Sequence, residues 1–215
     1  MRASSAEIRR AQPLLGTFVE IRVRGVSQNE VDRAFAAISL VHALMSAQAP
    51  DSDIARARSG RAVHPWTQRV LDRAAEIRAG SGGLFDVAAC GYALDGIAKG
   101  FAVDRAVDIL EAGGGAGCVN AGGDLRLFGD AFQEVHVRQG SNLVGIGRVR
   151  DAAVATSASA LLVDPRGPVG ATARGVTVIA ADCMSADALT KPCLLAPERA
   201  AELAARFDAI AWVHP

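Results

Sequence analysis

A lone lysine among glycines marks the first segment of this chain that could do chemistry. Residues Gly96–Gly100 read GIAKG, directly before an expected helix. Small residues would let the backbone approach a ligand closely, and the first amides of a helix favour an anion. Lys99 would add a mobile point charge suited to a phosphate. The segment therefore predicts a phosphate site, and its other interpretation is a glycine-bounded turn with a solvated lysine.

A second glycine pair with an acidic residue follows in Asn120–Asp124, which reads NAGGD between two short strand patterns. Packing alone does not require this pattern. Its other interpretation is an ordinary tight turn, for which Gly122, Gly123 and Asp124 are well suited.

Periodic patterns predict the elements that must position these two segments. Apolar residues alternate with charged ones from Val19 to Arg24, as in a half-buried strand, and Ser27 with Glu30 forms a capping box before a helix. Helices cluster early and strands late, which favours an α+β layout, and no linker is visible, so residues 1–215 are expected to form a single domain. The expected helices cover about 31–45, 65–80, 100–112, 185–191 and 197–207, and the later strands 118–121, 124–128, 134–138, 143–149, 152–155, 175–181 and 209–213.

Composition argues against several classes of protein. The 215 residues contain 23 basic and 23 acidic side chains, which argues against a surface built for nucleic acid. No apolar run is long enough to span a membrane, and the first residues lack the apolar core of a secretory signal. A cytoplasmic location is therefore expected, or a periplasmic one if the chain is processed. The four cysteines are dispersed and predict buried thiols and no zinc cluster.

The common nucleotide and hydrolase motifs are missing from the sequence. Lys99 is followed by glycine and phenylalanine and so does not complete a Walker loop. No glycine segment completes a dinucleotide fingerprint, no nucleophile elbow is present, and the four dispersed histidines do not indicate a triad.

Taken in order, a series of segments resembles the ApbE family of FAD:protein FMN transferases across nearly the whole chain. The resemblance implies a T-fold-like α+β protein that binds FAD and Mg²⁺. It also implies transfer of the FMN half of FAD to a threonine of a partner flavoprotein, with release of AMP. The segments are LLGTFVEIRV, MSAQAPDSDIARA, GGLFDVAA, LDGIAKGFAVDRAVDIL, VNAGGDLRLFG, AVATSAS, VDPRG and GVTVIAADCMSADALTK.

The same resemblance implies site residues in three roles. It assigns catalysis to Asp187 and Thr190, and the metal to Asp187, Thr190 and the carbonyl of Ala98. The cofactor-binding residues that it implies are Gly96, Lys99, Asn120, Gly122, Gly123, Asp124, Thr156, Ser157, Asp164 and Lys191.

The chain departs from the family pattern at three points. The link between the FDV and IAKG segments is short, and Leu161 stands where the family usually has a histidine, so this proton acceptor is missing. Lys191 stands where the family has a threonine, with Thr190 one residue early, which turns a helical side chain by about 100°. Either Thr190 still reaches the metal, or the Lys191 ammonium occupies the cation site.

These departures leave two alternatives to an active transferase. The first is a flavin-binding relative without catalysis, in which Lys99 and Lys191 hold phosphates that do not react. The second is an assembly or maturation partner that keeps only the scaffold.

Overall fold

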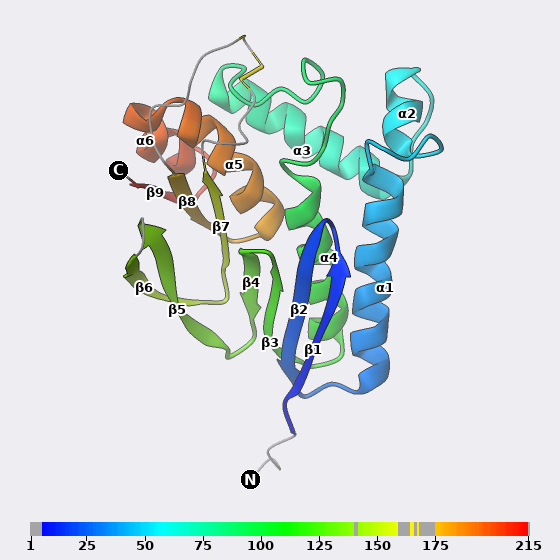
Figure 1. The fold of residues 1–215 in the computed structure, drawn as a ribbon, viewed down its shortest axis with the longest axis vertical. Coiled ribbons are helices and arrows are strands. Elements are labelled where there is room, and N and C mark those ends of the chain that lie inside the picture. Colours follow the sequence, from blue (N-terminus) through cyan, green and yellow to red (C-terminus); the bar gives the residue numbers. More distant parts are fainter. Residues whose placement is uncertain (1–5, 140–141, 159–163, 166, 168–174, 215) are drawn as a thin grey trace.

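A seven-stranded antiparallel sheet forms the centre of the structure, a computed structural model that describes residues 6–139, 142–158, 164–165, 167 and 175–214 (Figure 1). Its strand order is β1-β2-β3-β4-β7-β8-β9, and every neighbouring pair is antiparallel. The strands are β1 Ile8–Leu14, β2 Thr17–Arg24, β3 Ala116–Ala121, β4 Asp124–Phe128, β7 Ala153–Ala158, β8 Gly175–Ala180 and β9 Ile210–His214.

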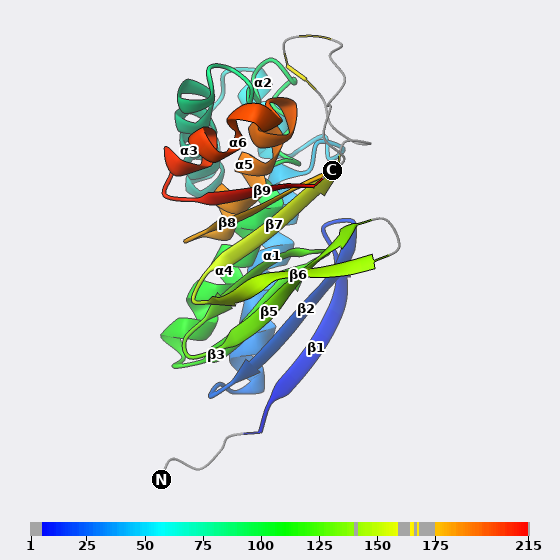
Figure 2. The ribbon, with the colours of Figure 1, turned by 90° about the vertical axis from the view of Figure 1, so that its left-hand side faces the viewer.

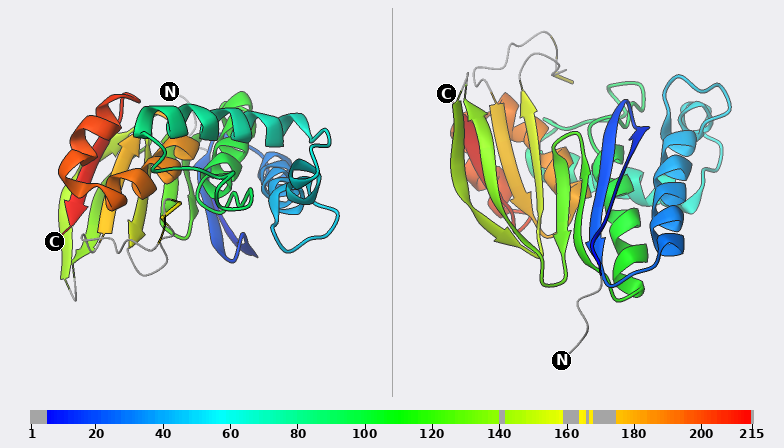
Figure 3. Two further views of the ribbon diagram at one scale, coloured as in Figure 1. Left: turned by 90° about the horizontal axis from the view of Figure 1, so that it is seen from above. Right: turned by 60° about the horizontal axis from the view of Figure 1, so that its bottom comes forward.

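All helices that pack on the sheet cover one of its faces (Figure 3). The first half of the sheet carries α1 and α4, the second half carries α5 and α6, and α3 lies across both halves. Their apolar faces and the inward side chains of the strands form the main core. The helices are α1 Gln28–Met45, α2 Asp53–Arg58, α3 Pro65–Ser81, α4 Ala98–Ala112, α5 Cys183–Leu195 and α6 Ala200–Ala205, with a 3₁₀ turn, η2, at Pro197–Arg199.

A separate two-stranded ribbon covers part of the opposite face (Figure 2). It consists of β5 Phe132–Gln139 and β6 Asn142–Arg150, which lie between β4 and β7 in the sequence. Because side chains alternate along a strand, Leu127 faces the ribbon while Phe128 faces the helices. A small second core results, built from Cys118, Leu125, Leu127, Val135 and Val154.

Local signals in the sequence set most element boundaries. The capping box at α1 is present, since the backbone amide of Ser27 donates to Glu30 Oε2 at 2.6 Å. The glycine run after α4 forms its C-cap: Gly114 adopts a φ of 81°, and the Gly115 amide donates to the Leu110 carbonyl at 2.9 Å. The α+β prediction is confirmed.

Three element predictions need correction. The third helix begins at Ala98, two residues before Gly100, and α5 extends four residues beyond Lys191. The helix expected over 197–207 is instead the turn η2 followed by the short α6.

No helix within the described ranges is long and apolar enough to cross a membrane.

Candidate functional site

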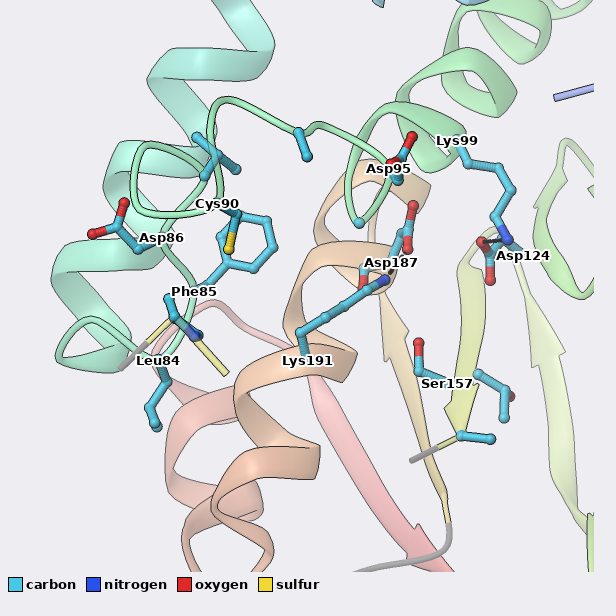
Figure 4. A pocket seen from close by; sticks show the side chains of 16 residues that line it. Leu84, Phe85, Asp86, Cys90, Asp95, Lys99, Asp124, Ser157, Asp187 and Lys191 are labelled. Carbon is cyan, nitrogen blue, oxygen red and sulfur yellow. Dashed lines mark hydrogen bonds and ion pairs between the residues drawn. The ribbon is translucent and has the colours of Figure 1, made fainter. Parts of the chain in front are cut away.

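A cavity of about 510 Å³ lies where the N-terminal end of α4 meets the middle of α5 (Figure 4). One end is apolar and is formed by the loop after α3. The other end is charged and is formed by side chains from α4, β4 and α5. The apolar end includes Leu84, Phe85, Val87, Cys90 and Ala93, and the charged end includes Lys99, Asp124, Asp187 and Lys191.

Lys99 and Asp124 form the first ion pair of the charged end. Lys99 is the second residue of α4, and its Nζ lies 2.8 Å from Oδ2 of Asp124, the first residue of β4 (Figure 4). The Asp124 side chain is only 4% exposed. Burial, then the nearby Asp187 carboxylate, raises the pKa of Asp124 to about 6, against the opposing effect of the lysines. Burial opposes the charge of Lys99, but Asp124 beside it raises the pKa of Lys99 above its ordinary value, so this pair is charged at neutral pH.

Asp187 and Lys191 form the second ion pair, one turn apart on α5. The Lys191 ammonium contacts Asp187 Oδ1 and also donates to the Asp187 carbonyl oxygen at 2.8 Å (Figure 4). The other carboxylate oxygen, Oδ2, accepts the backbone amide of Gly100 at 3.1 Å. Asp187 is 2% exposed, so these contacts compensate the cost of burying its charge.

Gly100 permits the close crossing of α4 and α5 that brings the two ion pairs together. A Cβ at Gly100 would lie 2.1 Å from the Cys183 carbonyl oxygen, which is far inside contact distance. The expectation that this glycine and its amide face a ligand is therefore corrected: the glycine packs against α5, and its amide binds Asp187. The Ala98 amide is also used within the protein, since it donates to the Leu94 carbonyl at 2.8 Å.

A buried carboxylate on α4 fixes the start of α5. Asp104 accepts the amides of Cys183 and Met184 at 2.9 and 2.8 Å, and Arg126 Nη1 donates to it at 2.9 Å. Asp182 accepts the next amide, that of Ser185, at 2.7 Å, so the first three amides of α5 all have acceptors. Asp187 follows one turn later and is thereby held against Gly100. Burial raises the pKa of Asp104 to about 6 although these donors lower it.

The predicted hydroxyl groups lie at the cavity but already have partners in the protein. Thr156 and Ser157 line it from β7, and Thr156 Oγ1 lies 2.7 Å from Thr177 Oγ1. Ser157 Oγ lies 2.7 Å from Thr190 Oγ1, and Thr190 also donates to the Asp187 carbonyl at 2.7 Å. Thr190 is fully buried behind Ser157. Thr156 and Ser157 can thus contact a ligand from the cavity wall, whereas Thr190 supports α5 from behind it.

The Asn120–Asp124 segment forms the tight turn between β3 and β4. Gly122 and Gly123 have φ values of 64° and 107°, and Asn120 Oδ1 accepts the Gly123 amide at 2.8 Å. Of these residues, Asp124 lines the cavity. The tight-turn interpretation thus describes Asn120, Gly122 and Gly123, and a ligand contact from these three remains a prediction.

The remaining predicted residues lie at the edges of the described site. Gly96 lines the cavity, Ala98 is the buried first residue of α4, and Asp164 is half-buried close enough to Cys90 to affect its pKa. Leu161 lies outside the described residues.

Sequence reasoning missed the apolar wall and a second cavity. The segment containing Leu84 and Phe85 served only as part of the resemblance, and the signal that could have found it is the paired glycine at 82–83 after α3. The second cavity, of about 330 Å³, is lined by the β1–β2 turn and the end of α1, and it shares Asp95 and Lys99 with the first. Lys99 therefore stands between two hollows.

The residues implied as magnesium ligands do not fit that ion in this arrangement. Magnesium requires near-octahedral oxygen ligands. The contacts of Lys191, Gly100 and Thr190 described above already engage both carboxylate oxygens and the carbonyl oxygen of Asp187. Across the described ranges, no three His, Cys, Asp or Glu side chains form a group that could hold a metal.

Comparison with known proteins places this geometry in a family. No curated protein matches the chain. The flavin transferase ApbE from Vibrio cholerae has 20% sequence identity and a TM-score of 0.85, over 97% of this chain and 93% of that one. The ApbE protein from Thermotoga maritima has 19% identity and a TM-score of 0.84, over 97% and 94% of the two chains. The apo flavinyl transferase ApbE from Pseudomonas stutzeri has 18% identity and a TM-score of 0.84, over 99% and 92%.

These structural likenesses show a shared fold. The family model described as the ApbE family matches residues 15–93 and 90–213, which together cover most of the sequence. The chain therefore belongs to the ApbE family.

Proposed function

We propose that this protein transfers the FMN half of FAD to a threonine hydroxyl of a partner flavoprotein and releases AMP. The observation that carries the proposal is the two-ended cavity, with an apolar wall at Leu84 and Phe85 and the ammonium groups of Lys99 and Lys191 opposite. The apolar wall suits the flavin ring, and the ammonium groups suit the phosphates. Family membership and the solved flavin transferases of the same fold support this choice of ligand.

The second cavity supports a dinucleotide over a mononucleotide. FAD carries two ring systems joined by a pyrophosphate, and the first and second cavities described above meet at Asp95 and Lys99. A pyrophosphate beside Lys99 would let one ring system enter each hollow. The pyrophosphate bond that must break would then lie against the charged end of the first cavity.

The reaction has three parts. The threonine oxygen forms a new bond to the FMN phosphorus, the bond from that phosphorus to the oxygen of AMP breaks, and the hydroxyl proton moves to a base. Lys99 and Lys191 neutralise the phosphate oxygens as charge develops on them. Asp124, whose pKa burial raises to about 6, is the cavity carboxylate that we assign to accept the proton.

A covalent-flavin assay tests the proposal. The purified protein is mixed with FAD and an acceptor domain, with Mg²⁺ or with EDTA, and flavin fluorescence is read on the acceptor after denaturation. We expect covalent flavin and an equal amount of AMP, and neither when the target threonine of the acceptor is changed to valine. Asp187→Ala should abolish transfer, because Lys191 loses the carboxylate that orients it.

Two observations favour a second function, flavin binding without transfer. Asp187 is fully engaged inside the protein, and Leu161 replaces the proton acceptor expected from the family. A protein that is purified yellow, yet gives no covalent flavin with any divalent metal, would establish this alternative and refute the transferase.

A further inference from the structure

The chain contains only two lysines, and both lie in the same cavity. Of its 23 basic residues, Lys99 and Lys191 are lysine and the other 21 are arginine. Each lysine pairs with a buried carboxylate in the cavity wall. An ammonium is a compact point charge, whereas a guanidinium is a planar fork. A chain that uses arginine almost everywhere else thus has the compact cation at these two positions alone.

The Lys191 ammonium lies where a small cation would bind Asp187. It contacts the carboxylate and the carbonyl oxygen of the same residue, as a metal ion held by two oxygens would. An ammonium has three N–H groups, and these contacts use two of them. Among the contacts between described residues, the third remains for a ligand in the cavity that Lys191 lines.

The loop before α4 provides a slot for the Lys191 side chain. A Cβ at Gly96 would lie 3.1 Å from Lys191 Cε and 3.5 Å from Phe85 Cε2. The aliphatic part of Lys191 therefore passes over Gly96, a position that has no side chain. Lys191 is only 20% exposed, so its place in the wall is fixed by packing as well as by charge.

The charges of the two ion pairs balance without a metal ion. Two ammonium groups face two carboxylates, and the pKa of Asp124 responds to both lysines and to Asp187, so the four groups act on one another. A divalent ion at Asp187 would have to displace Lys191 from both oxygens.

We propose that Lys191 is the resident cation of this site, so that the chain binds a dinucleotide pyrophosphate without a divalent metal. The identity of the dinucleotide rests on the proposed function, whereas the exclusion of the metal rests on Lys191, Asp187 and Gly96 alone.

The first test measures metal and ligand binding to the wild-type protein. Mn²⁺ binding is followed by the loss of the free-ion paramagnetic resonance signal. Affinities for FAD and for inorganic pyrophosphate are measured by calorimetry with EDTA and with Mg²⁺. We expect no bound Mn²⁺, and an FAD affinity that agrees between the two conditions within about twofold, since twofold is a small free-energy difference.

Two substitutions separate the charge of Lys191 from its size. Lys191→Met keeps the length and removes the charge, so FAD affinity should fall by about tenfold or more, with or without Mg²⁺. Lys191→Thr opens Asp187 and supplies a hydroxyl, so this variant should bind Mn²⁺ and make FAD binding depend on Mg²⁺. Arg206→Met removes one exposed charge at the C-terminal end of α6, outside the lining of the cavity, and should change neither measurement.

Gly96→Ala provides a packing test with the charge retained. The added methyl group would push Lys191 away from Asp187, so FAD affinity should fall severalfold. With lysine ¹³C-labelled at Cε, the NMR spectrum should show two lysine signals, of which Gly96→Ala shifts mainly that of Lys191. Unfolding curves of all variants, read by circular dichroism, identify any change that comes from misfolding.

Several results would overturn the proposal. One is Mn²⁺ bound by the wild-type protein; another is a tenfold loss of wild-type FAD affinity in EDTA that Mg²⁺ restores. An unchanged affinity in Lys191→Met would also refute it. Other results would refute the proposed function alone. Metal-free FAD binding without covalent transfer, or pyrophosphate binding without FAD binding, would show that the protein is not the proposed transferase. Both results would still agree with Lys191 as the cation of the site. Binding of neither ligand overturns both.

Discussion

Replacing Gly100 with alanine tests whether the crossing of α4 and α5 holds the site together. Alanine is the better helix former, so helix propensity alone predicts a gain of up to about 1 kcal/mol for this residue of the first turn of α4. The structure predicts the opposite sign. The new Cβ would lie 2.1 Å from the Cys183 carbonyl oxygen and 2.8 Å from Met184 Cα, and both of these are backbone atoms.

The magnitude follows from what must move. Ordinary contact begins at 3.4 Å, so α5 would have to shift by roughly 1.3 Å in a close-packed interior. Overpacking of this kind costs about 1–3 kcal/mol. The shift also stretches the bonds of Asp104 and Asp187 across the crossing, and each hydrogen bond to a charged group contributes about 1.5–3 kcal/mol. After the gain in propensity, we expect a net loss of about 3–5 kcal/mol, out of a typical total of about 5–15 kcal/mol.

Urea unfolding followed by circular dichroism measures this change. The matched control is Gly113→Ala at the other end of α4, where φ is −78° and the atoms nearest to the new Cβ belong to the side chains of Glu30 and Val26, at 3.2–3.3 Å. That variant should stay within about 1 kcal/mol of wild type. A Gly100→Ala protein as stable as the control, with unchanged FAD affinity, would refute the role given to this crossing.

Four further outcomes are expected. Asp104→Ala should destabilise the protein by about 3–5 kcal/mol in urea unfolding, since it leaves Arg126 without its buried partner, and wild-type stability would contradict this. Because folding raises the pKa of Asp124, protonation of its carboxyl group favours the folded state. This contribution to stability is complete below about pH 4 and is lost as the pH rises through about 6. Asp124→Asn should therefore flatten the dependence of the unfolding free energy on pH between about 4 and 7. Protonation of Asp124 also frees Lys99, so wild-type affinity for FAD should rise as pH falls through about 6, and a flat calorimetric profile would count against the ion pair's effect on binding. Cys90 is the half-buried thiol of the cavity wall, and the other three cysteines are buried. Bound FAD should therefore slow the reaction of Cys90 with a maleimide, which mass spectrometry can follow. Equal reaction rates with and without FAD would place the ligand elsewhere.

The sequence predicted elements with strong local signals and missed those that depend on tertiary contacts. Strand β1 contains Pro13 and two adjacent arginines, which weaken a strand pattern but are tolerated at the edge of a sheet. Helix α2 has six residues and is held by Asp53, whose carboxylate accepts from Thr67 Oγ1 at 2.6 Å and from the His64 amide at 2.8 Å. Neither partner can be read from the local pattern.

The candidate site divides in the same way. The resemblance brought Lys99, Asp124, Asp187 and Lys191 forward, and the structure does bring these four residues to one cavity. What sequence could not supply is the use of the Gly100 amide by α5, because that contact depends on how two distant helices pack. Asn120–Gly123 shows the opposite case, since the ordinary chemistry of a tight turn already explains those residues.

The bond between Gly100 and Asp187 joins residues 87 positions apart, and the bonds of Asp104 to Cys183 and Met184 span 79 and 80. Contacts this distant in sequence close long loops and form late, once much of the chain has ordered. A ribosome that has not yet released α5 therefore carries a chain without the Asp187–Lys191 pair at the cavity, however well its first helices have formed. If flavin binds there as proposed, its binding during synthesis or refolding would report that α5 has been completed.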